Sequence, residues 1–244
     1  MATTTPLSCG FLFVLLVGAL SCASGELVLP DPPGGGAVQL SKVDGPNGDN
    51  QEGVVGEQLP QPLIVQVLTA RESPATGRRV AFVITSSAGE VTPDTAITNS
   101  QGLATALWVL GTSPGAYVIQ AQLISGEEDS LQTEEFTAVA RAAAPDTLSP
   151  LSPVSQPGRR GHAVHTSPLI RVVDRFGNPV SDVPVAWQVV AGEGQITDPI
   201  TRTNSDGTAG VGWTLGDRIG VHKLTATIER ATGSPATFTA TVLF

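Results

Sequence analysis

The chain has 244 residues, of which 41% are hydrophobic and only 14% are charged, and it contains 27 glycines and 19 prolines. So many turn-forming residues, in a sequence rich in Val, Thr and Ala, favour many short strands over long helices. The formal net charge is −9, and no basic stripe is present that could bind the phosphates of a nucleic acid, so nucleic acid is excluded as a partner.

Residues 1–25 are predicted to be an export signal. Residues 11–20 form an apolar run that is too short to span a bilayer core of about 30 Å but long enough for the centre of a signal peptide. Residues 19–22 (ALSC) resemble the lipobox of bacterial lipoproteins, which implies acylation of Cys22. Since Ala23 is not the aspartate that retains such proteins at the inner membrane, the resemblance implies an anchor in the outer membrane. Cleavage near Ala23 or Gly25, which would release a soluble protein, is the alternative.

Residues 26–36 are rich in proline and glycine and are predicted to be a flexible linker. Beyond them the chain repeats itself. Residues 98–104 (TNSQGLA) recur as residues 203–209 (TNSDGTA), and Trp108 recurs as Trp213 at an offset of 105 residues. A period of this length corresponds to a whole domain. We therefore predict two copies of one module, the first copy at 37–141 and the second copy at 145–244, joined by a short linker that holds them end to end as a rod.

Within each copy the apolar residues alternate along the chain, which is the pattern of strands with one buried face. Matching positions at the same offset include Val80, Phe82 and Ile84 in the first copy and Val185, Trp187 and Val189 in the second. The prediction is an all-β protein made of two tandem immunoglobulin-like β-sandwiches with Greek-key connections and about seven strands each. Both cysteines, Cys9 and Cys22, lie in the first 25 residues, so neither copy contains an internal disulfide.

Four blocks of the second copy carry a family resemblance: residues 174–180 (DRFGNPV), 183–187 (VPVAW), 203–209 (TNSDGTA) and 220–226 (GVHKLTA). In this order and spacing they resemble the bacterial immunoglobulin-like domain of group 1, the type that is strung together in invasin and intimin. The first copy departs from the family's D-x-x-G-N-P turn and has TARESPA at residues 69–75. The resemblance implies an extracytoplasmic structural or adhesive module with no catalytic activity and no cofactor of its own.

Three histidines were weighed as functional groups. His162 and His165 are of a type that binds metals, but on an extended strand a spacing of three places their side chains on opposite faces. A surface strand is therefore predicted there in preference to a metal site. His222 matches Tyr117 of the first copy and is predicted to be a partly buried residue at the edge of the core, in preference to a catalytic base.

Acidic side chains gather in several places. Asp174, Asn178 and Asp206 carry oxygens that suit calcium, but a calcium site needs several of them to converge on one centre, and local turn capping explains each residue. Residues 127–129 (EED) and 134–135 (EE) are predicted to keep a hairpin soluble and to discourage pairing with other chains. A docking patch for a basic partner, or a weak surface for divalent ions, is the alternative for these residues.

Two further groups were considered as contact sites. As an alternative use of the acidic first copy, Arg159 and Arg160 at the start of the second copy would meet it across the junction, and such exposed pairs would orient the two copies but scarcely hold them together. The tryptophans Trp108, Trp187 and Trp213, together with Phe82, would suit a platform for stacking sugars, but their alternation with aliphatic residues predicts that they lie in the core.

The sequence thus predicts a non-enzymatic protein without a metal or cofactor, exported and held at the cell surface or outer membrane, or otherwise periplasmic or secreted. It would act as a stalk, an adhesion module or a protein-interaction module. Its partner would be an unidentified protein or a surface glycan, bound through loops or an exposed strand edge. A polysaccharide-binding or accessory module of a cell-surface assembly is the alternative function.

Overall fold

The computed structural model describes residues 38–86, 89–124 and 132–243. Within these ranges the chain forms strands and turns and has no helix, and therefore none long and apolar enough to cross a membrane. The predicted export signal, Cys22 and the linker at 26–36 lie outside the described residues. The all-β class predicted from the sequence is confirmed.

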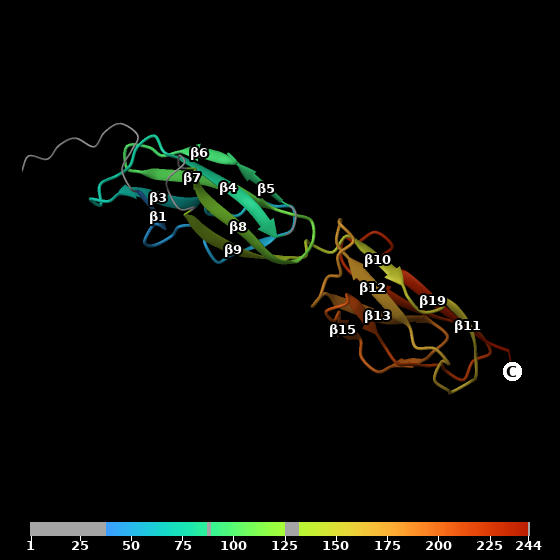
Figure 1. Ribbon diagram of the computed structural model, residues 1–244. Helices are drawn as coiled ribbons and strands as arrows, with labels where there is room; N and C mark the ends of the chain where they lie inside the picture. The colour runs from blue at the N-terminus through green and yellow to red at the C-terminus, as the bar shows by residue number, and fades with distance from the viewer. Residues whose placement is uncertain (1–37, 87–88, 125–131, 244) are drawn as a thin grey trace, which may run out of the picture. The chain divides into compact units, whose positions relative to one another are not determined.

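The described part of the first copy forms two sheets (Figure 1). One sheet has the strand order β1-β3-β7-β5 and the other has the order β2-β9-β8-β4-β6. All neighbouring strands are antiparallel except β2 and β9, which run parallel. The strands are β1 Val38–Lys42, β2 Gln51–Val54, β3 Leu63–Thr69, β4 Arg79–Ser86, β5 Gly89–Thr92, β6 Thr95–Ile97, β7 Leu103–Leu110, β8 Gly115–Ile124 and β9 Thr133–Arg141.

The second copy repeats this order of strands, with one strand of the first copy divided into two. Its larger sheet has the order β11-β19-β18-β13-β15, and β10-β12-β16 together with β14-β17 form the opposite layer. Strands β11 and β19 run parallel, as their counterparts do in the first copy. The strands are β10 Thr147–Pro150, β11 Ser155–Gly158, β12 Leu169–Val173, β13 Pro184–Ala191, β14 Gln195–Ile196, β15 Ile200–Arg202, β16 Thr208–Gly210, β17 Trp213–Thr214, β18 Gly220–Thr227 and β19 Ala236–Val242.

The sequence predicts about seven strands per copy, and the described residues contain nine strands in the first copy and ten in the second because some segments are counted as two strands. In each copy two edge segments change from one sheet to the other and so count twice, as β1 with β2 and β5 with β6. Proline and glycine stand at these crossings, for example Pro93 between β5 and β6, and proline cannot donate a backbone hydrogen bond to a sheet. The second copy has one more strand because Gly212 separates β16 from β17.

Each pair of sheets encloses its own apolar core. One cluster of buried residues runs from Val38 to Ala143 and the other from Leu148 to Val242. The alternation read from the sequence is the cause, since strand residues two apart point to the same side of a sheet. In β18, for example, His222, Leu224 and Ala226 are buried while their neighbours Val221 and Lys223 are exposed.

A glutamine fixes the segment that follows the short parallel strand in each copy; Gln51 is buried and Gln156 is partly buried. Gln156 accepts a hydrogen bond from the N–H of Thr166 at 2.9 Å and donates to the carbonyl of Thr166 at 2.8 Å. Gln51 makes the same pair of bonds to Gln61, both at 2.9 Å. In the second copy this pairing ties β11 to the loop at residues 159–168, which connects β11 to β12.

Candidate functional site

The three tryptophans lie in the cores, as predicted, and cannot form a sugar platform. Trp108, Trp187 and Trp213 are 0%, 3% and 1% exposed. Trp187 donates from Nε1 to Oγ1 of Thr201 at 2.8 Å, and Trp108 packs edge to face against Tyr117 with ring centroids 6.5 Å apart. The polysaccharide-binding alternative therefore loses the feature of the sequence that suggested it.

Asp174 caps a turn, as predicted, with both carboxylate oxygens engaged. Its Oδ1 accepts from the N–H groups of Phe176 and Asn178, and its Oδ2 accepts from the N–H of Ala143 and from Nδ2 of Asn178, all at 2.9 Å. Burial alone would raise the pKa of Asp174, but the hydrogen bonds from Asn178, Ala143 and Phe176 lower that pKa below its ordinary value. Asp206 is exposed in a different turn, so the two carboxylates have separate local roles.

His222 is a core residue and is buried more completely than predicted, with 1% of its surface exposed. Its Nε2 lies 2.9 Å from the carbonyl oxygen of Arg218, four residues earlier. Tyr117, the matching residue of the first copy, donates its hydroxyl to the carbonyl of Ser113, also four residues earlier, at 2.6 Å. Since a carbonyl only accepts hydrogen bonds, Nε2 carries a proton. The imidazole thus stabilises a loop and is not placed for base catalysis.

The prediction of a surface strand at His162 and His165 is wrong. Both residues lie in the loop between β11 and β12, where the chain does not alternate between two faces. The two side chains line the same cavity, although the spacing of three on a strand would have separated them. No group of three or more His, Cys, Asp or Glu side chains in the described ranges could hold a metal ion.

This cavity, here called the loop pocket, lies beside the end of β19 and has a volume of about 810 Å³. That volume falls within the range of about 300–1,000 Å³ that is usual for small-molecule sites. Arg159, Arg160, His162 and His165 line it from the loop, Thr241 lines it from the end of β19, and Leu243 lines it from the residue that follows β19.

The loop pocket carries two arginines that have no ion-pair partner among the described residues. Among the described residues, neither the Arg159 nor the Arg160 guanidinium makes a hydrogen bond or an ion pair, and both side chains are exposed. His162 donates from Nδ1 to the carbonyl of Arg160 at 2.8 Å, which fixes the orientation of its ring. Asp217 lies near the loop, since its Oδ1 would be 3.1 Å from a Cβ added at Gly161, but Asp217 does not line the cavity.

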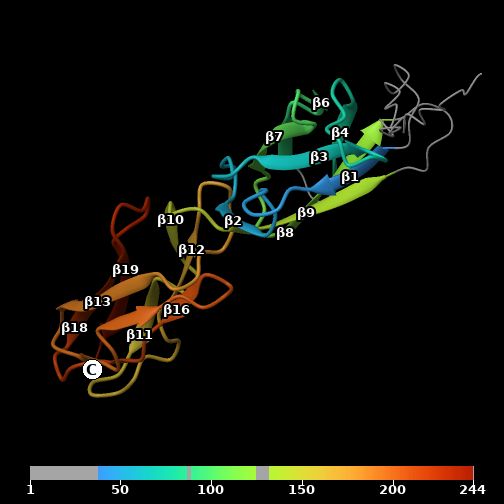
Figure 2. The ribbon, with the colours of Figure 1, turned by 90° about the vertical axis from the view of Figure 1, so that its left-hand side faces the viewer.

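The expectation that Arg159 and Arg160 lie at the linker end of the second copy is wrong. Thr147, where the chain enters this copy, pairs with Thr232, just before β19 begins. Gly158, directly before the arginines, pairs with Val242 at the far end of β19. Strand β11 and the carboxyl terminus accordingly lie at the same end of the second copy in both views (Figures 1 and 2). The arginines are therefore at the end where the chain leaves the sandwich.

Of the acidic residues predicted to lie around a hairpin of the first copy, the structure describes Glu134 and Glu135. Residues 127–129 lie outside the described ranges. Glu134 is partly buried and Glu135 is exposed at the start of β9, because neighbouring residues of a strand point to opposite faces. The alternative of a docking patch for a basic partner remains a prediction for residues 127–129.

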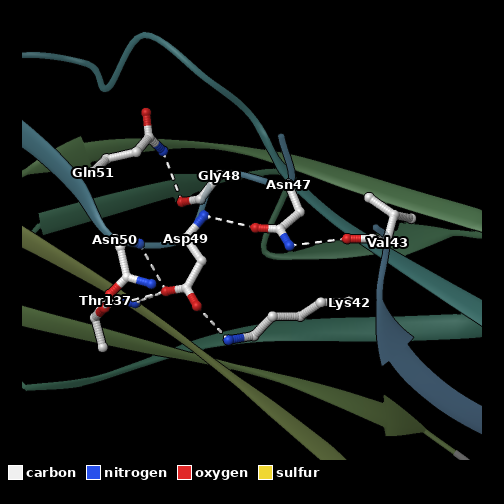
Figure 3. Close-up of polar contacts among 8 residues, drawn as sticks. All are labelled: Lys42, Val43, Asn47, Gly48, Asp49, Asn50, Gln51 and Thr137. Carbon is white, nitrogen blue, oxygen red and sulfur yellow. Dashed lines mark hydrogen bonds and ion pairs between the residues drawn. The ribbon is translucent and has the colours of Figure 1, made fainter. Parts of the chain in front are cut away.

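A polar cluster in the first copy escaped the sequence analysis. Asp49 accepts hydrogen bonds at Oδ1 from the N–H of Asn50 and the N–H of Thr137, both at 2.8 Å, and at Oδ2 from Nζ of Lys42 at 2.5 Å (Figure 3). Nζ of Lys42 also lies 5.1 Å from the ring centroid of Phe136. Burial would raise the pKa of Asp49, but the hydrogen bonds from Lys42, Thr137 and Asn50 lower it below the ordinary value of 3.8. No local motif marks this cluster, because Asp49 and Thr137 are 88 residues apart.

Comparisons with known proteins agree with this fold. Residues 165–241 match the model of the family described as bacterial Ig-like domain (group 1), which confirms the resemblance of the motif blocks in the second copy. No curated protein matches the chain in sequence.

Several solved structures are similar to this chain. The Escherichia coli adhesin FdeC is 18% identical, with a TM-score of 0.54; the alignment covers 86% of this chain and 64% of that one. InvD of Yersinia pseudotuberculosis is 16% identical, with a TM-score of 0.48, over 81% of this chain and 58% of that one. The D00-D0 domain of intimin is 14% identical, with a TM-score of 0.43, over 85% and 100%. The likeness to FdeC supports the immunoglobulin-like fold.

Proposed function

We propose that this protein is a non-enzymatic module of a bacterial cell surface, in which immunoglobulin-like sandwiches serve adhesion or act as a stalk. The observation that carries the proposal is the match of residues 165–241 to the bacterial Ig-like family, in a chain whose first copy repeats the strand order of the second. The fold likeness to an Escherichia coli adhesin supports the same assignment.

The buried polar side chains named next form structural hydrogen bonds, which supports a role without catalysis. Gln51, Thr98, Asp174 and Thr203 are each less than 10% exposed, and each bonds to main-chain groups of a turn or loop. Catalytic groups are usually gathered in a cleft with altered pKa values. The two carboxylates with lowered pKa values, Asp49 and Asp174, are instead saturated by structural hydrogen bonds.

The proposed location is the outer membrane, through a lipid on Cys22. An acyl chain contributes about 0.8 kcal/mol per buried CH₂, and more than one chain makes a durable anchor. Mass spectrometry of the mature amino terminus should find Cys22 as the first residue, carrying diacylglycerol. Cys22→Ala should move the protein from the membrane fraction to the soluble fraction, whereas Cys9→Ala should leave its distribution unchanged. Membrane retention of the Cys22→Ala protein would refute the anchor.

Adhesion can be tested on cells that express the full-length protein. External protease should digest the exposed protein on intact cells, and these cells should adhere more strongly to a host-cell or glycan-coated surface than cells expressing the released Cys22→Ala protein. Complete protection from protease on intact cells would place the protein inside the outer membrane and would contradict the surface function.

A further inference from the structure

We propose that the loop pocket of the second copy binds a carboxylated saccharide, with Arg159 and Arg160 pairing with its carboxylate. The proposal rests on the proposed surface function, since saccharides are the ligands that a surface module meets. It is carried by four features: an ordered loop, unpaired guanidinium groups, the absence of these residues from the first copy, and a strand edge unsuited to a peptide.

The loop is held in place before any ligand arrives. Besides the Gln156 pairing to Thr166, the N–H of Leu215 bonds to the carbonyl of His162 at 3.0 Å, and Ala163 forms a bridge with Thr214. These bonds attach the middle of the loop to β17 and the segment after it. A binding loop that is already ordered loses little conformational entropy when the ligand binds.

The charge of the loop pocket specifies an anionic group. Arg159 and Arg160 stand in a chain of net charge −9, yet neither guanidinium has an acidic partner in the described part of the chain. A guanidinium presents a planar fork of donors that matches the two oxygens of a carboxylate. Two adjacent free guanidiniums at one cavity therefore suit a carboxylate as the principal ligand group.

The first copy has the same fold but lacks these residues at the corresponding positions, so the fold does not require them. At the offset of 105 that relates Gly53 to Gly158, the counterparts of Arg159, Arg160, His162 and His165 are Val54, Val55, Glu57 and Pro60. Val55 is fully buried, so the first copy uses this segment for packing. The basic and imidazole groups of the second copy are not required to build the sandwich.

The wall of the loop pocket suits a compact ligand better than a peptide strand. Pro157 lies in the edge strand β11 and lines the pocket, and proline withholds the N–H that an added strand would need. Thr241 offers a hydroxyl for the ligand's hydroxyl groups, and Leu243 is 65% exposed and offers an apolar contact for the face of a sugar ring. A saccharide presents both kinds of surface beside its carboxylate.

Calorimetric titration of the purified full-length protein with trigalacturonic acid tests the proposal. The fully methyl-esterified trisaccharide is the matched neutral ligand, and triglutamate with blocked ends supplies carboxylates on a peptide. Arg159→Ser/Arg160→Ser removes the pocket guanidiniums. Arg78→Ser/Arg79→Ser removes an adjacent arginine pair elsewhere, of which Arg78 is partly buried and Arg79 is exposed, and changes the net charge equally. Thermal unfolding of both variants checks that they fold.

We expect trigalacturonic acid to bind the native protein and its methyl ester to bind at least about tenfold more weakly. The affinity for the acid should fall at least about tenfold in Arg159→Ser/Arg160→Ser and change by less than about twofold in Arg78→Ser/Arg79→Ser. Affinity should also fall as ionic strength rises. No binding of the acid, equal binding of the ester, or equal losses in the two variants would overturn the proposal. Equal or stronger binding of triglutamate would overturn the saccharide assignment and favour a protein partner. Because this assay uses purified protein, its outcome is independent of whether the protein is found at the surface.

Discussion

Substitution of Asp49 tests whether a single carboxylate holds the segment before β2 against β9. Asp49→Ala removes the acceptor for Lys42 Nζ and for the main-chain N–H groups of Asn50 and Thr137. The Asp49 side chain is 17% exposed and that of Lys42 is 25% exposed, so the groups left behind are only partly hydrated. An unpaired polar group in such a place destabilises the folded state.

The expected loss of unfolding free energy for Asp49→Ala is about 3 kcal/mol, because hydrogen bonds to charged groups contribute about 1.5–3 kcal/mol each and those sharing one carboxylate do not add. Asp49→Asn keeps an acceptor for the two N–H groups but loses the ion pair, and should cost about 1–2 kcal/mol. Val154→Ala is the matched control. In the second copy the N–H of Thr239 bonds to the main-chain carbonyl of Val154 at 2.8 Å, so removal of that exposed side chain should cost less than about 0.5 kcal/mol.

Hydrogen exchange in increasing denaturant, read separately on peptides that contain β9 and β19, measures the stability of each copy in the intact chain. Asp49 variants should lower the protection of β9 and leave that of β19 unchanged. Equal losses for Asp49→Ala and Val154→Ala, or a loss for Asp49→Asn as large as that for Asp49→Ala, would refute the reasoning.

The same carboxylate predicts a dependence on pH. Because the pKa of Asp49 in the folded protein is below its ordinary value of 3.8, the unfolded chain binds the proton more readily. The stability that Asp49 contributes is therefore fully present above that value and is lost as the pH falls through the folded pKa. The difference in stability between the native protein and Asp49→Asn should be largest near neutral pH and should shrink below pH of about 4. A difference that stays constant across this range would contradict the assignment.

Two paired substitutions test the duplicated turns. Gly207 has φ of +70°, and a Cβ there would clash with the carbonyl oxygen of Val172, whereas Gly177 has φ of +84° with open space around it. In thermal unfolding, Gly207→Ala should lower the free energy of unfolding by about 3 kcal/mol and Gly177→Ala by about 1 kcal/mol. The hydroxyls of Thr98 and Thr203 each join two main-chain groups at 2.6–2.9 Å, so Thr98→Val and Thr203→Val should each cost about 1–3 kcal/mol in denaturant unfolding. Costs that differ by more than about 1.5 kcal/mol between the two threonines would show that the copies do not use this contact equally.

The features that the sequence predicted are those encoded locally and repeated. The buried tryptophans follow from alternation over a few residues, and the Asp174 turn follows from a motif whose partners lie within four residues of one another, apart from Ala143. The repeat itself identified the two turns at Gly102 and Gly207, which have φ of +72° and +70°. Such features depend on backbone preferences and on spacing, and both can be read from one sequence.

The features that the sequence did not predict depend on which strands become neighbours. The Asp49 cluster needs β9 beside the segment before β2, and the loop pocket needs the end of β11 beside Thr241 and Leu243. Both arrangements come from the parallel pairing of a short early strand with the last strand of the copy, β2 with β9 and β11 with β19. No local sequence pattern predicts that pairing. His162 and His165 are misplaced by the sequence pattern because it predicts a strand for a segment that forms the loop between β11 and β12.

Comparison of the two copies distinguishes the contacts that maintain the fold, which both copies share, from the residues that differ between the copies. The parallel edge strand is held alike in both copies, by the Gln51 and Gln156 pairings and by Gly53 and Gly158, where a Cβ would collide with Leu110 and Leu215. The two copies differ in the residues that flank this strand: the first has its charged cluster just before β2, and the second has its basic loop just after β11. Because the shared contacts secure the strand itself, its flanks can change chemistry without loss of the sandwich. A site that distinguishes one copy from the other is therefore expected at these flanks, which is where the loop pocket lies.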